Sequence, residues 1–182
     1  MLARMTPFET ALDEIDALHR EDPARRELDY AERMTRWLDR LDAAPDPLLV
    51  LAVRAQHLKR WERPRGDYPT GRAGYLKWRR DAAAHHARLV AEVLARAGYA
   101  PDACARVVDL VQKRDLSRDA LAQTLEDCAC LVFFETELAA FAAKQPAEKV
   151  ADVLAKTWRK MSSRARALAR PLLPAGTTPP DD

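Results

Sequence analysis

The sequence is short of glycine, of cysteine and of long apolar segments, and each shortage excludes a class of structure or location. Only five of the 182 residues are glycine, whereas alanine, leucine, arginine and glutamate are abundant, and this composition favours helix. No apolar run is long enough to cross a bilayer, and no charged start leads into an apolar segment, so we expect a cytoplasmic protein with no membrane partner. Cys104, Cys128 and Cys130 make an odd count without CxxC spacing, which indicates reduced core thiols rather than metal or redox ligands.

The chain has enough apolar residues for one domain with a core. Hydrophobic residues make up 48% and charged residues 32%, as in an ordinary globular domain. The net charge of +2 is close to balance, so a charged partner would have to bind to a local cluster of charged residues. These features predict an all-α fold, with a single helical domain of about seven helices over residues 1–170. A disordered tail rich in proline, threonine and aspartate is expected over residues 171–182.

The segments with helical spacing of apolar residues begin and end at recognisable signals. Thr6 and Glu9 form a capping box, Asp46 caps a third helix, and Gly98 ends a fourth. Two prolines and a glycine within residues 62–70 forbid a continuous helix there, so the third helix is expected to run unbroken only as far as residue 61. The expected helices cover approximately residues 7–20, 29–41, 47–61, 71–97, 101–113, 119–145 and 147–161, and the last can resume after Ser162 and Ser163.

Residues 56–80 are unusually basic and aromatic. They hold eight of the thirty Lys and Arg residues of the chain but only two acids, Glu62 and Asp67. A basic loop interleaved with rings can grip a phosphorylated partner by charge and by stacking. A solvated charged face with some core aromatics is the alternative interpretation. The candidate substrate-binding residues in and around this stretch are Arg54, Arg60, Trp61, Arg65, Tyr68, Arg72, Tyr75, Arg79 and Lys113.

Three polar residues fall on the inward side of three different helices and are candidate metal ligands: His57, His86 and Asp127. Imidazole and carboxylate suit Mn, Fe or Zn, and an open coordination position would activate water. Asp127 and its neighbour Glu126 are the candidate catalytic carboxylates. The alternative is a buried His–Asp pair without metal, or an ion pair of Asp127 with a basic residue. His85 lies about 100° round its helix from His86 and is expected to be exposed.

Five stretches of the chain resemble one family catalogued as a domain of unknown function, DUF 4202. The stretches read LDYAERMTRWL at 28–38, RAQHLKRWERPRGDYPTGRAGYLKWR at 54–79, LVQKRDL at 110–116, QTLEDCACLVFFETE at 123–137 and KTWRKMS at 156–162. Members of this family are often labelled glutamyl-tRNA synthetase. That label is not carried over, because the chain has neither a Rossmann domain nor a HIGH motif and is too short for a whole synthetase. The resemblance itself implies no particular reaction.

A second resemblance is to HD-domain phosphohydrolases, which are all-α and hold metal with His and Asp from separate helices. Leu48 to His57 looks like the apolar helix that ends in their His-Asp pair, and Asp127 stands where their distant last Asp is expected. Leu58 replaces the paired Asp, and no histidine matches their first ligand. The resemblance implies an HD-like fold and a divalent metal.

The sequence leaves three functions open. The first is a metal-dependent hydrolase of a phosphorylated small molecule or nucleotide, in which the arginines of residues 56–80 hold phosphate oxygens. The alternative is a non-catalytic RNA- or tRNA-binding module that uses this stretch and a second basic face over residues 156–170. The third is a helical scaffold without a ligand.

Overall fold

The computed structural model describes residues 5–174 and residue 177, and in this part of the chain all regular structure is helical. The predicted all-α class is therefore confirmed. The α-helices are α1 (Pro7–Arg20), α2 (Glu27–Leu41), α3 (Pro47–Arg54), α4 (Gly71–Arg96), α5 (Pro101–Val111), α6 (Ala120–Thr136), α7 (Leu138–Ala142), α8 (Ala147–Trp158) and α9 (Ser163–Ala169). Three short 3-10 helices join them, η1 (Arg60–Glu62), η2 (Arg65–Asp67) and η3 (Arg170–Leu172).

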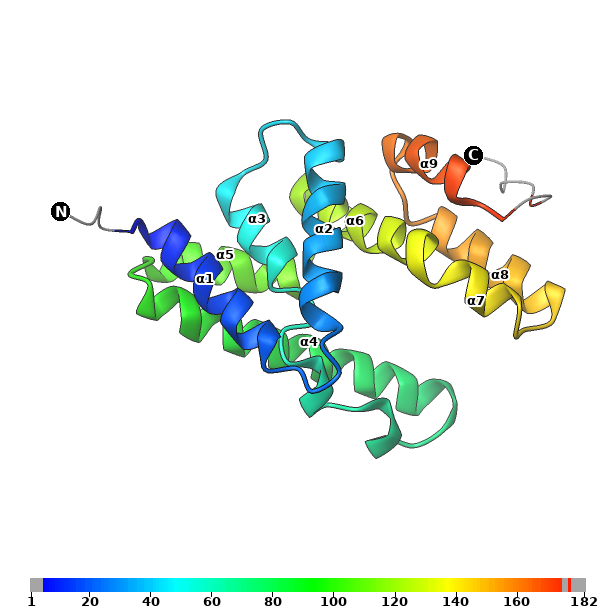
Figure 1. Cartoon of the computed structure of the whole chain (residues 1–182), viewed down its shortest axis with the longest axis horizontal. Helices are drawn as coiled ribbons and strands as arrows, with labels where there is room; N and C mark the ends of the chain where they lie inside the picture. Colours follow the sequence, from blue (N-terminus) through cyan, green and yellow to red (C-terminus); the bar gives the residue numbers. More distant parts are fainter. Residues whose placement is uncertain (1–4, 175–176, 178–182) are drawn as a thin grey trace.

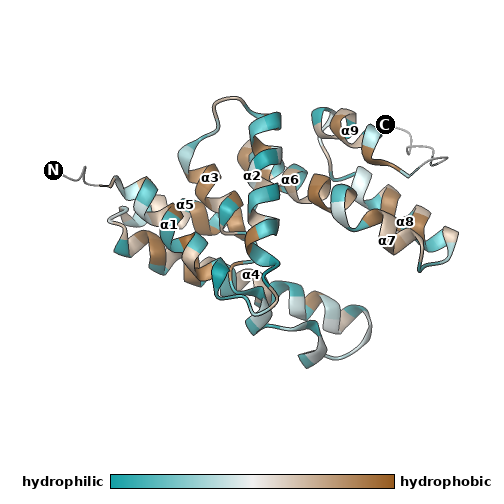
Figure 2. Cartoon of the chain, viewed as in Figure 1, coloured by the Kyte–Doolittle hydropathy of each residue, from teal (hydrophilic) through white to brown (hydrophobic). Residues whose placement is uncertain are grey.

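The helices pack around α2, α3 and α5, as Figure 1 shows. α5 lies against α4 and α3, while α2 lies against α6 and α3. The long α4 runs along one side of this body, and its N-terminal half extends beyond it, beneath α6 and α8 in the view of Figure 1. Figure 2 shows apolar residues concentrated on α3 and α5, in keeping with the four fully buried or nearly buried apolar residues of the short α3. No helix in the described residues is long and apolar enough to span a membrane.

Several helix ends form where the sequence signals predicted them. The Thr6 hydroxyl oxygen accepts a hydrogen bond from the Glu9 amide at 3.2 Å, and the Thr6 amide donates one to the Glu9 carboxylate at 2.8 Å, which completes the capping box. Asp46 accepts from the Leu48 amide at 2.7 Å. Gly98 follows α4 in the left-handed region with φ +91°, a conformation that glycine adopts without a Cβ penalty.

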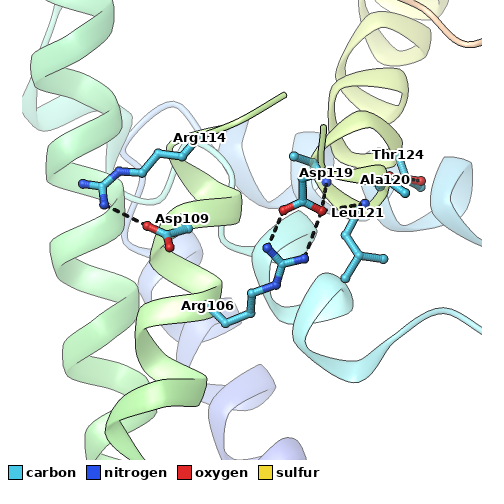
Figure 3. A network of polar contacts seen from close by, with 8 residues as sticks. Arg106, Asp109, Arg114, Asp119, Ala120, Leu121 and Thr124 are labelled. Carbon is cyan, nitrogen blue, oxygen red and sulfur yellow. Dashed lines mark hydrogen bonds and ion pairs between the residues drawn. The ribbon is translucent and has the colours of Figure 1, made fainter. Parts of the chain in front are cut away.

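A network of polar contacts fixes the connection between α5 and α6 (Figure 3). The Arg106 guanidinium donates two hydrogen bonds to the Asp119 carboxylate. Asp119 also caps α6 by accepting from the Leu121 amide at 3.0 Å. Arg114, just beyond α5, pairs with Asp109 at 2.8 Å. Because both sides of this connection are tied down, the end of α5 is held facing the first half of α6.

The third helix differs from the prediction, because it ends at Arg54 instead of continuing to residue 61. The backbone turns into the left-handed region at His57, with φ +62°, and again at Lys59, with φ +51°. Side chains from elsewhere satisfy the carbonyls released there. His19 Nε2 lies 2.8 Å from the Arg54 carbonyl, and His86 Nδ1 lies 2.7 Å from the Leu58 carbonyl. These partners are distant in sequence, which is why local pattern did not predict the break.

One longer predicted helix is divided in two, and a short helix follows the last predicted one. The expected helix over 119–145 is interrupted at Glu137, whose φ of −114° separates α6 from α7. The expected last helix, α8, ends at Trp158, three residues before the expected end. Helix α9 then begins at Ser163, in agreement with the expected resumption, and the Ser162 hydroxyl accepts from the Ala165 amide at 3.2 Å as its N-cap. The division into α6 and α7, together with α9, accounts for the larger number of α-helices in the described residues.

The predicted tail lies mostly outside the described residues. Its first part forms η3, and Leu172 and Leu173 pack against the hydrophobic core. Residues 175–176 and 178–182 lie outside the described part of the chain.

Candidate functional site

Two adjoining cavities open where the basic stretch meets the helical body. The first has a volume of about 820 Å³ and lies between α4, the end of α5, α6 and α8. The second has a volume of about 690 Å³ and lies between the start of α2, the turn after α3 and the loop that precedes α4. His57, Arg60 and Trp78 line both cavities and form the boundary between them.

His57 is held at this boundary by contacts on several sides. Its ring stacks on Tyr30 with 4.2 Å between centroids, and both ring nitrogens lie 3.0 Å from a guanidinium nitrogen of Arg60. Burial, reinforced by the Arg60 charge, holds the pKa of His57 well below its ordinary value, so the imidazole is neutral. The left-handed backbone at His57 costs free energy, and such conformations cluster at functional sites.

His86 approaches the same boundary from α4. Its Nδ1 must donate to the Leu58 carbonyl, because a carbonyl oxygen can only accept, and the neutral ring therefore carries its lone pair on Nε2. Burial lowers the pKa of His86 to about 4. The centroids of His57 and His86 are 6.0 Å apart. His85 is buried, contrary to the prediction that it is exposed, because Glu62 of η1 covers it with a carboxylate oxygen 3.0 Å from Nε2.

Glu126 faces the first cavity from α6 and is already neutralised. Lys113 donates a short hydrogen bond to its carboxylate, and the Lys160 ammonium lies 3.7 Å away. Burial alone would raise the pKa of Glu126, but the two lysines outweigh burial and hold the pKa below its ordinary value. Lys113 sits in the left-handed region with φ +54°, so a second strained residue lines this cavity.

Positive charge dominates the lining of the first cavity. Glu126 is the single acid there, against six cations: Arg60, Arg79, Arg80, Lys113, Arg114 and Lys160. Two of the guanidinium groups lie over rings, Arg60 over Trp78 at 4.9 Å and Arg79 over Tyr75 at 5.9 Å. The arrangement can bind an anion that also presents a flat or apolar group.

Glu27 is a candidate functional residue that the sequence prediction missed. It lines the second cavity, and its carboxylate lies 3.8 Å from Nδ1 of His57. Burial raises the pKa of Glu27 to about 7, against a smaller opposite effect of Arg60. In the sequence, an acid in the first turn of a helix is indistinguishable from an ordinary helix-dipole charge, so no local signal could identify it.

Asp127 is not brought together with the two histidines. Its carboxylate accepts hydrogen bonds from the Ser162 amide at 2.9 Å, the Ser162 hydroxyl at 2.5 Å and Gln123 Nε2 at 3.0 Å, and it lines neither cavity. Burial raises the pKa of Asp127 despite these donors. Asp127 therefore holds the start of α9 against α6.

The predicted metal donors do not fit one ion as they stand. His57 and His86 share the first cavity, but a guanidinium occupies the space beside the nitrogens of His57. Across residues 5–174 and 177, no three His, Cys, Asp or Glu side chains lie close enough to hold a metal. Binding of Mn, Fe or Zn stays a prediction, and no step below is routed through a metal.

The predicted substrate-binding residues divide into three groups. The first cavity is lined by Arg60, Tyr75, Arg79 and Lys113. The second is lined by Arg60, Trp61 and Arg65. Neither cavity is lined by Arg54, Tyr68 or Arg72.

The residues that line neither cavity have other contacts or lie on the surface. Arg54 is held by Asp16 through hydrogen bonds of 2.6 and 2.8 Å. The Lys77 ammonium lies 5.1 Å from the ring centroid of Tyr68, and Arg72 is exposed on the first turn of α4. Arg65 lines the second cavity, but it spends two donors on the Tyr68 and Pro69 carbonyls, each at 2.9 Å, and so closes its own loop.

The chain belongs to the family described as Domain of unknown function (DUF4202), whose sequence profile matches residues 9–177. This match confirms the resemblance carried by the five sequence stretches. No curated protein and no solved structure matches the chain. The HD-like fold therefore stays a prediction, and the case for a function depends on the cavities.

Proposed function

We propose that this protein binds a phosphorylated small molecule in the first cavity and hydrolyses it. The single observation that carries this proposal is the charge of the cavity lining, six cations against one acid that two of those cations already neutralise. Phosphate oxygens accept charge-assisted hydrogen bonds from guanidinium and ammonium groups. The volume of the first cavity, about 820 Å³, is within the range of small-molecule sites.

The guanidinium groups of Arg60 and Arg79 are the proposed phosphate ligands. Each lies over an aromatic ring, which limits its freedom before a ligand arrives. Neither Arg79 nor Arg60 makes an ion pair within 4.0 Å of an acid in the described part of the chain, and Arg60 contacts the neutral His57 and the ring of Trp78. Both therefore keep their charge for an incoming anion.

Hydrolysis needs a group that orients water and accepts its proton. In the proposed step the water oxygen bonds to phosphorus, and the bond from phosphorus to the leaving oxygen breaks with its electron pair on that oxygen. The water donates its proton to the lone pair on His86 Nε2, since Nδ1 is already committed to the Leu58 carbonyl. His57, at the boundary of both cavities, positions Arg60 for the phosphate.

The test is a matched pair of arginine substitutions on α4. Arg79→Ala removes a proposed phosphate ligand, whereas Arg88→Ala removes an exposed arginine that pairs with Glu92 away from both cavities. Losing a charge-assisted contact costs roughly 1.5–3 kcal/mol, so Arg79→Ala should weaken binding of inorganic tripolyphosphate about ten- to a hundredfold. Arg88→Ala should bind tripolyphosphate with the affinity of the unmodified protein. In a second assay, Arg79→Ala should lower the release of phosphate from a nucleotide library. Equal affinity of the two variants, or no binding by the unmodified protein, contradicts the proposal.

A second candidate function is RNA or tRNA binding, and one observation favours it. The N-terminal half of α4 exposes Tyr75 and Leu76, 43% and 51% accessible, among Arg72, Lys77 and Arg80. Exposed rings between cations are typical of single-stranded nucleic-acid surfaces. Binding of bulk tRNA across a salt series tests it, because each phosphate contact makes affinity fall further as salt rises. An absence of tRNA binding at low salt removes this candidate.

A further inference from the structure

We infer that the ligand is a nucleoside polyphosphate, with its nucleoside in the second cavity and its phosphate chain in the first. This inference rests on the proposed function and extends it to a class of substrate. It starts from the fact that the two cavities adjoin at His57, Arg60 and Trp78, so one ligand can enter both.

The two cavities differ in charge balance. The first has six cations and one acid, which suits several phosphate groups. The second has five arginines against four acids, so its lining is almost balanced. A polar lining with nearly balanced charge does not favour a polyanion such as the phosphate chain. It suits an uncharged group with hydrogen-bonding edges, such as a base and its sugar.

The side chains of the second cavity match the parts of a nucleoside. Trp61 lines it with an indole ring, and every base has a face that stacks on such a ring. Glu27 makes no hydrogen bond through its carboxyl group in the described residues, and a carboxylate is the group that accepts from the hydroxyls of a ribose. Asp22, by contrast, is used within the protein, because it accepts from the amides of Ala24, Arg26 and Glu27.

The boundary residues lie where the nucleoside of the ligand would connect to its phosphate chain. Arg60 lies over Trp78 at 4.9 Å and faces His57, so its guanidinium stands where the chain would cross from one cavity to the other. The combined space, about 690 Å³ beside about 820 Å³, exceeds what a mononucleotide needs. Four of the six cations of the first cavity already pair with acids of the protein, and Arg60 and Arg79 are the two that do not in the described residues. A nucleoside monophosphate held in the second cavity would leave Arg79 unused.

The experiment compares ATP, GTP, adenosine monophosphate and inorganic tripolyphosphate by isothermal titration calorimetry. ATP or GTP should bind at least tenfold more tightly than adenosine monophosphate. Trp61→Ala and Glu27→Gln should each weaken the nucleoside triphosphate at least fivefold and leave tripolyphosphate unchanged. Arg79→Ala should weaken both ligands. Glu27→Gln keeps the size and shape of the side chain, so it serves where Trp61→Ala fails to fold.

The outcomes separate this inference from the proposed function. Suppose tripolyphosphate and ATP bind with equal affinity, and neither Trp61→Ala nor Glu27→Gln affects ATP. The nucleoside inference is then overturned, while the anion-binding cavity stands. Should neither tripolyphosphate nor any nucleotide bind, the proposed function is overturned and the inference with it.

Discussion

The two halves of α4 are one continuous helix with two different roles. From residue 82 to 96 its inward side is buried against α5 and α1, and Val90, Val93 and Leu94 are fully inaccessible. From residue 71 to 81 only Gly74 is buried, and the exposed side chains include the cations Arg72, Lys77, Arg79 and Arg80 together with Tyr75 and Leu76. The comparison teaches that the C-terminal half stabilises the fold, while the N-terminal half keeps its side chains available for a ligand.

The largest expected effect is on stability and separates the two halves directly. Leu94→Ala should lower the free energy of unfolding by about 2–5 kcal/mol, because it leaves a cavity in the core. Leu76→Ala, the same change on the same helix at a residue 51% accessible, should change it by less than about 0.5 kcal/mol. Urea unfolding of the two variants measures both, and similar losses would show that the projecting half is packed against the body.

The next largest expected effect is the loss of stability caused by the buried carboxyl group of Glu27. The pKa of Glu27 is raised from 4.5 to about 7, so the folded state holds a proton that the unfolded state releases between these values. The contribution of Glu27 to the stability is therefore fully present below about pH 4.5 and is lost as the pH rises through about 7. The loss is at most about 3.5 kcal/mol, since the two pKa values differ by about 2.5 and each pH step of one is worth roughly 1.4 kcal/mol.

Glu27→Gln should remove this pH dependence. The variant should be more stable than the unmodified protein at pH 8 by about 1–3 kcal/mol and nearly equal to it at pH 4.5. Urea unfolding at a series of pH values measures the difference. An identical pH profile for the two proteins would mean that Glu27 titrates normally and is well solvated.

A close approach of backbone joins the projecting half of α4 to the loop before it. A Cβ at Gly74 would lie 1.9 Å from the Pro69 carbonyl oxygen, so only glycine fits without movement of the loop. Gly74→Ala should cost about 1–3 kcal/mol and also weaken the binding of tripolyphosphate, because the loop that would move continues from η1, which begins at the boundary residue Arg60. Gly66→Ala is the matched control, since nothing lies within 4 Å of its added Cβ. If the two alanine variants bound tripolyphosphate with equal affinity, the position of the loop would not affect binding.

The smallest expected effect concerns the closure of the same loop. Arg65 donates to two carbonyls, which the single ammonium of lysine cannot do with the same geometry. Arg65→Lys should lower the melting temperature by about 2–4 °C, equivalent to roughly 1 kcal/mol for a chain of this size. Arg63→Lys should leave it unchanged. A weakened affinity for tripolyphosphate at unchanged melting temperature would instead make Arg65 a direct ligand contact.

The sequence predicted where in the chain the candidate site lies, but not which side chains contact one another there. The excess of charge and rings over residues 56–80 indicated an anion site, and Arg60, Tyr75 and Arg79 do line the first cavity. Helical phase correctly predicted that Asp127 is buried. Phase cannot say which neighbour a buried side chain meets, and Asp127 meets the start of α9 while the adjacent Glu126 meets the cavity and Lys113.

By itself the sequence determined the helical class, the family and most helix starts, because these depend on composition and on contacts within one turn, such as the capping box at Thr6. Only the tertiary structure decided where α3 stops and where His57 points. Carbonyls at that break are satisfied by His19 and His86, from helices far away in the sequence. It also decided that Glu27 lies beside His57, because burial between packed helices, which no local pattern encodes, is what raises the pKa of that carboxyl group.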